Sequence, residues 1–185
     1  MAWKNDQVNE RETARILGLA QECLTNVEGD FTEFGCYRGD TSLLLADLIK
    51  KSSRKLWLYD SFEGLPKKRK EDESVLGENF KEKELFVTKR EVKERFLRAG
   101  IPVPIIKKAW FCDLREDDLP DKIAFSFIDG DFYESIRDAL KLVEPKMSNG
   151  GVIVVHDYSN PALPGVKKAV DEWIKSKNDY RVILL

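Results

Sequence analysis

Acidic side chains stand directly after several apolar, strand-like runs of this sequence. The acids are Asp60, Asp129, Asp131 and Asp157, and the single histidine of the chain, His156, precedes the last of them. Carboxylates that gather at one rim of a sheet repel one another and take up protons unless a cation joins them. The pattern therefore favours a divalent cation at the place where these runs end.

The candidate metal ligands are Asp129, His156 and Asp157. The aspartates supply the hard oxygen ligands that suit Mg²⁺, which keeps several waters and leaves positions open for substrate oxygens. The imidazole broadens the choice towards Mn²⁺, Fe²⁺ or Zn²⁺. The alternative is that the aspartates cap the helices that follow them and that the histidine is an ordinary hydrogen-bonded residue at the sheet edge.

A second candidate site is the glycine-bounded turn Gly35-Cys-Tyr-Arg-Gly39, between a predicted strand over residues 31–34 and a predicted helix over residues 41–49. Such a loop presents free backbone N–H groups at the mouth of an open α/β sheet, and glycine lets a ligand approach the backbone. Glu33 is expected to point towards the same crevice. We predict a nucleoside-containing cofactor over Gly35 and Gly39, with an ordinary strand-to-helix turn as the alternative.

Two further features extend this candidate cofactor site. Asp60 ends a predicted strand about 25 positions after the first glycine, where a carboxylate suits the ribose hydroxyls of a nucleoside; the alternative is a turn cap. Trp110 and Phe111 follow a predicted strand whose prolines suit a sheet edge. These two aromatic side chains either flank an adenine ring or fill the core.

Strands must alternate with helices to bring these residues to one edge, and the sequence predicts that alternation. The predicted strands cover residues 31–34, 55–59, 103–109, 123–128, 151–155 and 180–185, and the predicted helices cover residues 9–27, 41–49, 87–99, 133–143 and 164–175. The glycine-rich stretch 147–151 is expected to separate the fourth helix from the strand after it. The pattern indicates a doubly wound, mostly parallel α/β sheet in three layers.

Composition limits the classes of protein that this chain can be. Its 185 residues, 42% of them hydrophobic, suit a single domain over residues 1–185. The net charge of −2 provides no field that attracts nucleic acid or an anionic membrane. No apolar run approaches the roughly 20 residues of a membrane span, so a cytoplasmic protein with small-molecule partners is expected, with a homo-oligomer as an open alternative.

Residues 63–99 form a charged insertion of mixed sign between two predicted strands. A basic patch for nucleic acid is one interpretation, but acids interleave with the lysines and arginines throughout. A solvated insertion that acts as a lid beside the cofactor crevice is the favoured one.

Several motifs together resemble the macrocin O-methyltransferase family. They are the glycine turn with its flanks, Tyr59-Asp-Ser-Phe-Glu-Gly-Leu-Pro66, Ala109-Trp-Phe111, Ile128-Asp-Gly-Asp-Phe-Tyr-Glu-Ser135 and His156-Asp-Tyr158. The resemblance extends from about Ala14 to Trp173. It implies a class I methyltransferase fold and an enzyme that uses S-adenosylmethionine and Mg²⁺ to methylate hydroxyls of sugars and other parts of natural products.

The resemblance also implies a role for individual residues. Those assigned to the methionine part of the cofactor are Glu33, Gly35, Tyr37 and Ser42, those assigned to the ribose are Asp60 and Ser61, and those assigned to the adenine are Trp110 and Phe111. Asp129 stands at both the cofactor and the metal, Asp157 is a second metal ligand, and Asp131 matches the general base.

Two departures from the family separate this chain from its relatives. His156 stands where the family usually has the first of two aspartates, and the sequence ends after the sixth predicted strand, where methyltransferases of this architecture add a seventh. His156 and the charged insertion motivate one alternative function, a non-catalytic relative that binds S-adenosylmethionine or nucleic acid. A nicotinamide-dependent oxidoreductase is another, although the glycine turn is not G-x-G-x-x-G.

Overall fold

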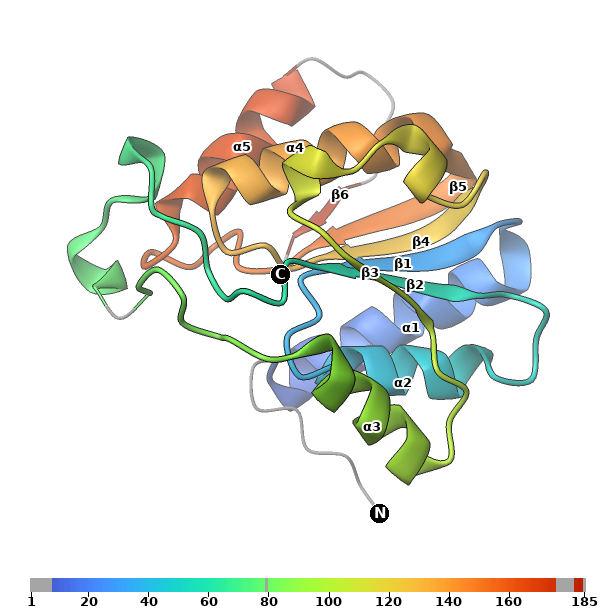
Figure 1. Ribbon diagram of the computed structural model, residues 1–185. Helices are drawn as coiled ribbons and strands as arrows, with labels where there is room; N and C mark the ends of the chain where they lie inside the picture. The colour runs from blue at the N-terminus through green and yellow to red at the C-terminus, as the bar shows by residue number, and fades with distance from the viewer. Residues whose placement is uncertain (1–7, 79, 176–181, 185) are drawn as a thin grey trace.

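The computed structural model describes residues 8–78 and 80–175, and the backbone of residues 182–184. Within these residues six parallel strands form one sheet in the order β3-β2-β1-β4-β5-β6 (Figure 1). The strands are β1 (Asp30–Phe34), β2 (Leu56–Asp60), β3 (Ile105–Lys108), β4 (Ile123–Ile128), β5 (Met147–Val155) and β6 (Val182–Leu184). The strand order reverses between β1 and β4, where ligands bind in open α/β sheets.

Helices cover both faces of the sheet, so the predicted three-layer architecture is confirmed (Figure 1). The helices are α1 (Glu10–Asn26), α2 (Asp40–Ile49), α3 (Lys89–Ala99), α4 (Tyr133–Val143) and α5 (Pro164–Lys175). The first three pack on one face, and α4 and α5 pack on the other. Every residue of β4 is buried, as expected for a central parallel strand that is covered on both sides.

Local sequence explains where the helices begin and end. The side chain of Asn9 accepts a hydrogen bond from the amide of Glu12, and the Glu12 carboxylate accepts one from the amide of Asn9, so a capping box starts α1. Thr88 and Glu91 form the same motif at the start of α3, and Gly100 ends that helix in the left-handed conformation.

The predicted break over residues 147–151 is wrong, because β5 already begins at Met147, directly after a 3₁₀ turn over Glu144–Lys146. Met147 pairs with Ile123 of β4, and the register shifts between Ile123 and Phe125. Because of this shift in register, residues 147–151 form part of β5 rather than a loop. The predicted edge position of β3 is confirmed, since β3 is the first strand of the sheet. Of the last predicted strand, residues 180, 181 and 185 lie outside the described residues.

The charged insertion over residues 63–99 consists of two structurally different parts. Its second part forms α3, which belongs to the helical layer rather than to a lid (Figure 1). Its first part docks near the starts of α4 and α5: Asp72 accepts a hydrogen bond of 2.7 Å from the amide of Tyr133, and Ser74 donates one of 2.9 Å to the carbonyl of Pro161. Asp72 is only 1% exposed. A buried carboxylate therefore anchors this part of the insertion.

Among the described residues, no helix combines the length and the apolar character that crossing a bilayer requires.

Candidate active site

The backbone hydrogen-bond ladder continues one residue past the ends of three neighbouring strands. The amide of Gly35 donates to β2 at 2.9 Å, that of Asp129 donates to β1 at 2.8 Å, and that of His156 donates to β4 at 3.0 Å. Because parallel strands end at the same edge, these hydrogen bonds hold the three residues side by side. The sheet itself thus positions the glycine turn next to the acidic cluster.

A cavity of about 220 Å³ opens at this edge. The predicted site residues that line it are Gly35, Tyr37, Asp60, Ser61, Trp110, Phe111, Asp129, Asp131, His156 and Asp157. Glu33, Gly39 and Ser42 do not line it. Most of the residues that the sequence assigned to cofactor, metal and proton transfer therefore share one cavity.

Backbone strain is concentrated around the cavity. Six described non-glycine residues adopt left-handed φ angles between 43° and 68°, namely Tyr37, Phe62, Lys83, Leu85, Asp131 and Asp157. Four of the six, Tyr37, Leu85, Asp131 and Asp157, line the cavity. Such conformations are costly for residues with a side chain and cluster at functional sites.

Gly35 is required for a reason that the sequence did not indicate. Its φ angle is +86°, and a Cβ atom there would lie 2.0 Å from the carbonyl oxygen of Asp129. The missing side chain therefore lets the loops after β1 and β4 approach each other. Gly39, with a φ angle of +79°, is the N-cap of α2 and meets only ordinary contacts.

Glu33 is a buried acid with an unpartnered oxygen. The residue is 1% exposed, and neither its Oε2 atom nor the neighbouring Ser42 hydroxyl has a hydrogen-bond partner among the described residues. Burial raises the pKa of Glu33 well above its usual range; the Ser42 side chain beside it opposes this shift, and the Asp129 and Asp60 carboxylates add to it. A buried polar atom without a partner points to a missing donor.

Asp60 ties two loops of the cavity together. Its carboxylate oxygens accept hydrogen bonds of 3.0 Å from the amide of Tyr37 and 2.7 Å from the amide of Phe62. Burial raises the pKa of Asp60, and these amides oppose that shift. Asp60 therefore does cap a turn, as the alternative interpretation of the sequence proposed. Each of its carboxylate oxygens also retains a lone pair that can accept a hydrogen bond from a ligand hydroxyl.

The neighbouring predicted residues have mixed roles. The Ser61 hydroxyl donates to the carbonyl of Gly64 at 3.2 Å, which stabilises the turn after β2. Phe111 packs edge-on against Phe34, with ring centroids 5.3 Å apart, and so fills the core while it lines the cavity. Trp110 lines the cavity without belonging to either hydrophobic cluster.

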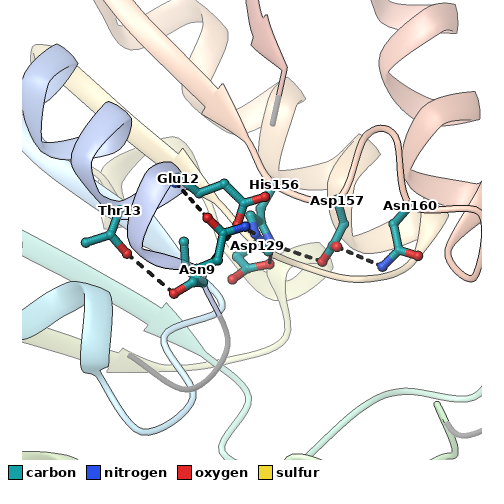
Figure 2. Close-up of polar contacts among 8 residues, drawn as sticks. Asn9, Glu12, Thr13, Asp129, His156, Asp157 and Asn160 are labelled. Carbon is teal, nitrogen blue, oxygen red and sulfur yellow. Dashed lines mark hydrogen bonds and ion pairs between the residues drawn. The ribbon is translucent and has the colours of Figure 1, made fainter. Parts of the chain in front are cut away.

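Asp129, His156 and Asp157 form a compact cluster (Figure 2). The Nδ1 atom of His156 lies 3.1 Å from Oδ1 of Asp129 and 2.9 Å from Oδ2 of Asp157. Two ligands at right angles on a cation, each about 2.1 Å from it, lie about 3.0 Å apart. The separations therefore suit both an ion pair and a set of ligands that share a divalent cation.

The charges of the cluster depend on one another. Burial alone would lower the pKa of His156, but the Asp129 and Asp157 carboxylates outweigh it and raise that pKa to about 11. Burial likewise opposes ionisation of Asp157, but the imidazole lowers the pKa of that carboxyl. Without a cation the histidine is thus an imidazolium that balances the two carboxylates.

Asp131 lies within the same field of negative charge. Burial, followed by the Asp129 and Asp157 carboxylates, raises the pKa of Asp131 well above its usual range. No described residue donates a hydrogen bond to its carboxylate. Asp131 is therefore an unpartnered, easily protonated acid at the wall of the cavity.

The structure adds two polar residues that the sequence reasoning missed. Asn160 donates from Nδ2 to Oδ1 of Asp157 at 2.9 Å, which fixes that aspartate from the outside. Glu12, on α1, places Oε2 at 3.4 Å from Nε2 of His156. The spacing of Asp157 and Asn160 within one turn is a usable signal, whereas Glu12 is distant in sequence and no local pattern links it to His156.

Phe80 and Leu85, both from the charged insertion, also line the cavity. They are apolar residues in a highly charged stretch, and that contrast is the signal that could have identified them. The insertion therefore forms part of the cavity wall.

A profile of the family described as Macrocin-O-methyltransferase (TylF) matches residues 14–181. Among curated proteins, the chain is 29% identical over 163 residues to an 8-demethyl-8-(2,3-dimethoxy-alpha-L-rhamnosyl)-tetracenomycin-C 4'-O-methyltransferase of Streptomyces olivaceus, which covers 84% of this chain. It is 31% identical over 156 residues to the demethyldecarbamoylnovobiocin O-methyltransferase of Streptomyces niveus, which covers 80% of this chain. The matches span 59% of the length of either relative.

Solved structures agree with this assignment. The structure of the O-methyltransferase NovP has 30% sequence identity and a TM-score of 0.72, over 86% of this chain and 71% of that one. The fold is thus that of class I methyltransferases, as predicted. Since the family profile covers nearly all of the sequence, the chain belongs to the macrocin-O-methyltransferase family.

Proposed function

We propose that this chain is an S-adenosylmethionine-dependent O-methyltransferase that acts on a hydroxyl of a small molecule, such as a sugar or another part of a natural product. One observation carries the proposal: a single cavity is lined by Asp60 and by the cluster of Asp129, His156 and Asp157, which follow the ends of nearby strands. A nucleoside site and a polar reaction site are thereby adjacent. The names of the relatives, which specify O-methylation, support the same reaction.

The residues present fit the cofactor. S-adenosylmethionine supplies a methyl group on a sulfonium when it is bound. Asp60 would accept hydrogen bonds from the ribose, and Trp110 with Phe111 would flank the adenine. The buried and unpartnered Oε2 atom of Glu33 supports a donor group on the methionine side, with Ser42 beside it.

The residues also fit a divalent cation, held by Asp129, His156 and Asp157. The separations of 2.9 and 3.1 Å around the imidazole and the mixed oxygen and nitrogen donors support this assignment. A bound cation supplies a Lewis acid that makes a nearby hydroxyl more acidic. Asp131 would then accept the proton of the acceptor, since a positive charge in the cluster favours its ionised form.

Methyl transfer requires the acceptor oxygen in line with the methyl group, at roughly 3–3.5 Å. Phe80 and Leu85 from the insertion would exclude water from that space. We propose that residues 63–87 are the lid over the acceptor. We also propose that the chain is a single domain, that it is cytoplasmic, and that it has no nucleic-acid or membrane partner.

A cation-free form of the reaction is a second candidate, and one observation favours it. The imidazolium of His156 already places a positive charge between Asp129 and Asp157. In that form the histidine, rather than a cation, would balance the carboxylates next to the acceptor.

Calorimetry with S-adenosylmethionine, NAD and a short oligonucleotide tests the cofactor. We expect binding of one S-adenosylmethionine per chain and no binding of the other two. Preferential binding of NAD or of the oligonucleotide contradicts the proposal. The same titrations with Mg²⁺ or Mn²⁺, and after treatment with a chelator, separate the cation-dependent form from the cation-free form.

A further inference from the structure

Helix α1 places the carboxylate of Glu12 next to the Nε2 atom of His156. Figure 2 shows Glu12, Asp129 and Asp157 gathered around His156; Glu12 faces Nε2, and the two aspartates face Nδ1. The distances are 3.4 Å from Nε2 to Glu12, against 3.1 and 2.9 Å from Nδ1 to the two aspartates. Each ring nitrogen therefore faces carboxylate oxygen.

The position of the Glu12 carboxylate is fixed by the start of its own helix. The Oε2 atom that faces His156 also accepts a hydrogen bond of 3.2 Å from the amide of Asn9. The amide of Glu12 in turn donates to Oδ1 of Asn9 at 3.0 Å. Because the capping box restrains this side chain, Glu12 presents a pre-set acceptor to the imidazole.

The ring of His156 is enclosed on further sides. Only 7% of the residue is exposed, and Phe127 packs edge-on against it with centroids 6.1 Å apart. The Glu12 side chain is 30% exposed, so the carboxylate stands between the ring and solvent. A flip of the ring about the Cβ–Cγ bond would put ring carbons where the two nitrogens lie, and Glu12 opposes that flip because its carboxylate faces Nε2.

An imidazole that binds a cation through one nitrogen generally donates its other N–H to a carboxylate, which fixes the tautomer and the ring orientation. We propose that Glu12 is a positioning residue for His156: it keeps Nε2–H outward and turns Nδ1 towards Asp129 and Asp157. The effect on a bound cation rests on the proposed function. The orientation of the ring does not.

The competing explanation is that Glu12 serves only as the capping residue of α1. Glu12→Gln separates the two roles, because glutamine at this position also forms a capping box but lacks the negative charge. Asn9→Ala is the matched control, since it removes the capping side chain and leaves the Glu12 carboxylate in place.

The first readout is the affinity for Mn²⁺, measured by calorimetry. Glu12→Gln is expected to weaken binding by about 10–100-fold, the usual cost of losing such an outer partner. In a His156→Asp background there is no imidazole to orient, so Glu12→Gln should change Mn²⁺ affinity by less than about 3-fold. Asn9→Ala should lower the melting temperature and leave Mn²⁺ affinity unchanged. Equal losses of affinity in Asn9→Ala and Glu12→Gln, or equal effects in both backgrounds, overturn the positioning role.

The second readout needs no cation. His156 is the only histidine, so the ring resonances of ¹⁵N-histidine-labelled protein have a single assignment. We expect an Nε2–H proton that is protected from exchange in the wild type and in Asn9→Ala, and that is lost or shifted upfield in Glu12→Gln. An identical ring spectrum in Glu12→Gln overturns the inference. If the wild type binds no Mn²⁺ but shows this pattern, only the cation proposal fails.

Discussion

Proton release on cation binding is the sharpest consequence of the acidic cluster. Because its pKa is raised to about 11, His156 is protonated near neutral pH. A cation must displace the proton on Nδ1 before that nitrogen can bind the cation. Raising the pH towards this value removes the competing proton and strengthens cation binding, and lowering the pH weakens it.

The size of the effect follows from the number of protons. One proton released per cation makes the affinity rise about tenfold, or about 1.4 kcal/mol, for each pH unit. Between about pH 6.5 and about pH 8.5 we therefore expect a gain of about 100-fold, or about 2.7 kcal/mol, for Mn²⁺. Asp131, whose pKa is also raised, would add to this release rather than oppose it.

Calorimetry in two buffers with different ionisation enthalpies counts these protons. His156→Asp is the control, since it removes the imidazole while Asp131 stays, and its proton release should be smaller by one per cation. The same change should favour Mg²⁺ over Mn²⁺, because all ligands are then oxygen. Equal proton release and equal metal preference in the two proteins would refute the assignment of His156 as a ligand.

Three further predictions concern the cofactor and the insertion. Asp60→Ala removes the proposed hydrogen bonds to the ribose, so calorimetry should show cofactor affinity weakened by about 1.5–3 kcal/mol; unchanged affinity would exclude the ribose contact. The same change leaves the amides of two loops without partners, so a thermal melt should show reduced stability. Asp72→Ala should cost about 1–3 kcal/mol in chemical unfolding because it removes the buried anchor of the insertion, whereas the exposed Glu73→Ala should cost less than about 0.5 kcal/mol; equal costs would argue against the anchor. Protease cleavage within residues 78–88 should slow when cofactor and acceptor are bound, and equal cleavage rates would count against a lid.

The strand-end acids could be predicted because alternation of strands and helices fixes which residues reach one edge of a parallel sheet. Asp60, Asp129 and Asp157 therefore line the cavity as expected. The path of β5 through a glycine-rich stretch could not be predicted, since pairing with β4 overrides the local turn preference.

The reasons behind individual residues were harder to predict than their positions. Gly35 is needed for the approach of the Asp129 carbonyl, a contact between loops that are distant in the sequence. Glu12 reaches His156 only because α1 packs beside β5, and no local pattern signals that contact. Tertiary packing, rather than motif spacing, decides both.

The methyl group of the bound cofactor should lie beside the cation site, and paramagnetic relaxation tests this arrangement directly. In the strand order, the tip of β3 is three to four strands from a cation held at β4 and β5, whereas the methionine end at β1 is one to two strands from it, so adenine would be the more distant part of the cofactor. Mn²⁺ added to the protein with bound S-adenosylmethionine should broaden the methyl proton resonance far more than the adenine resonances. Equal broadening of both, or no binding of S-adenosylmethionine, would contradict the account.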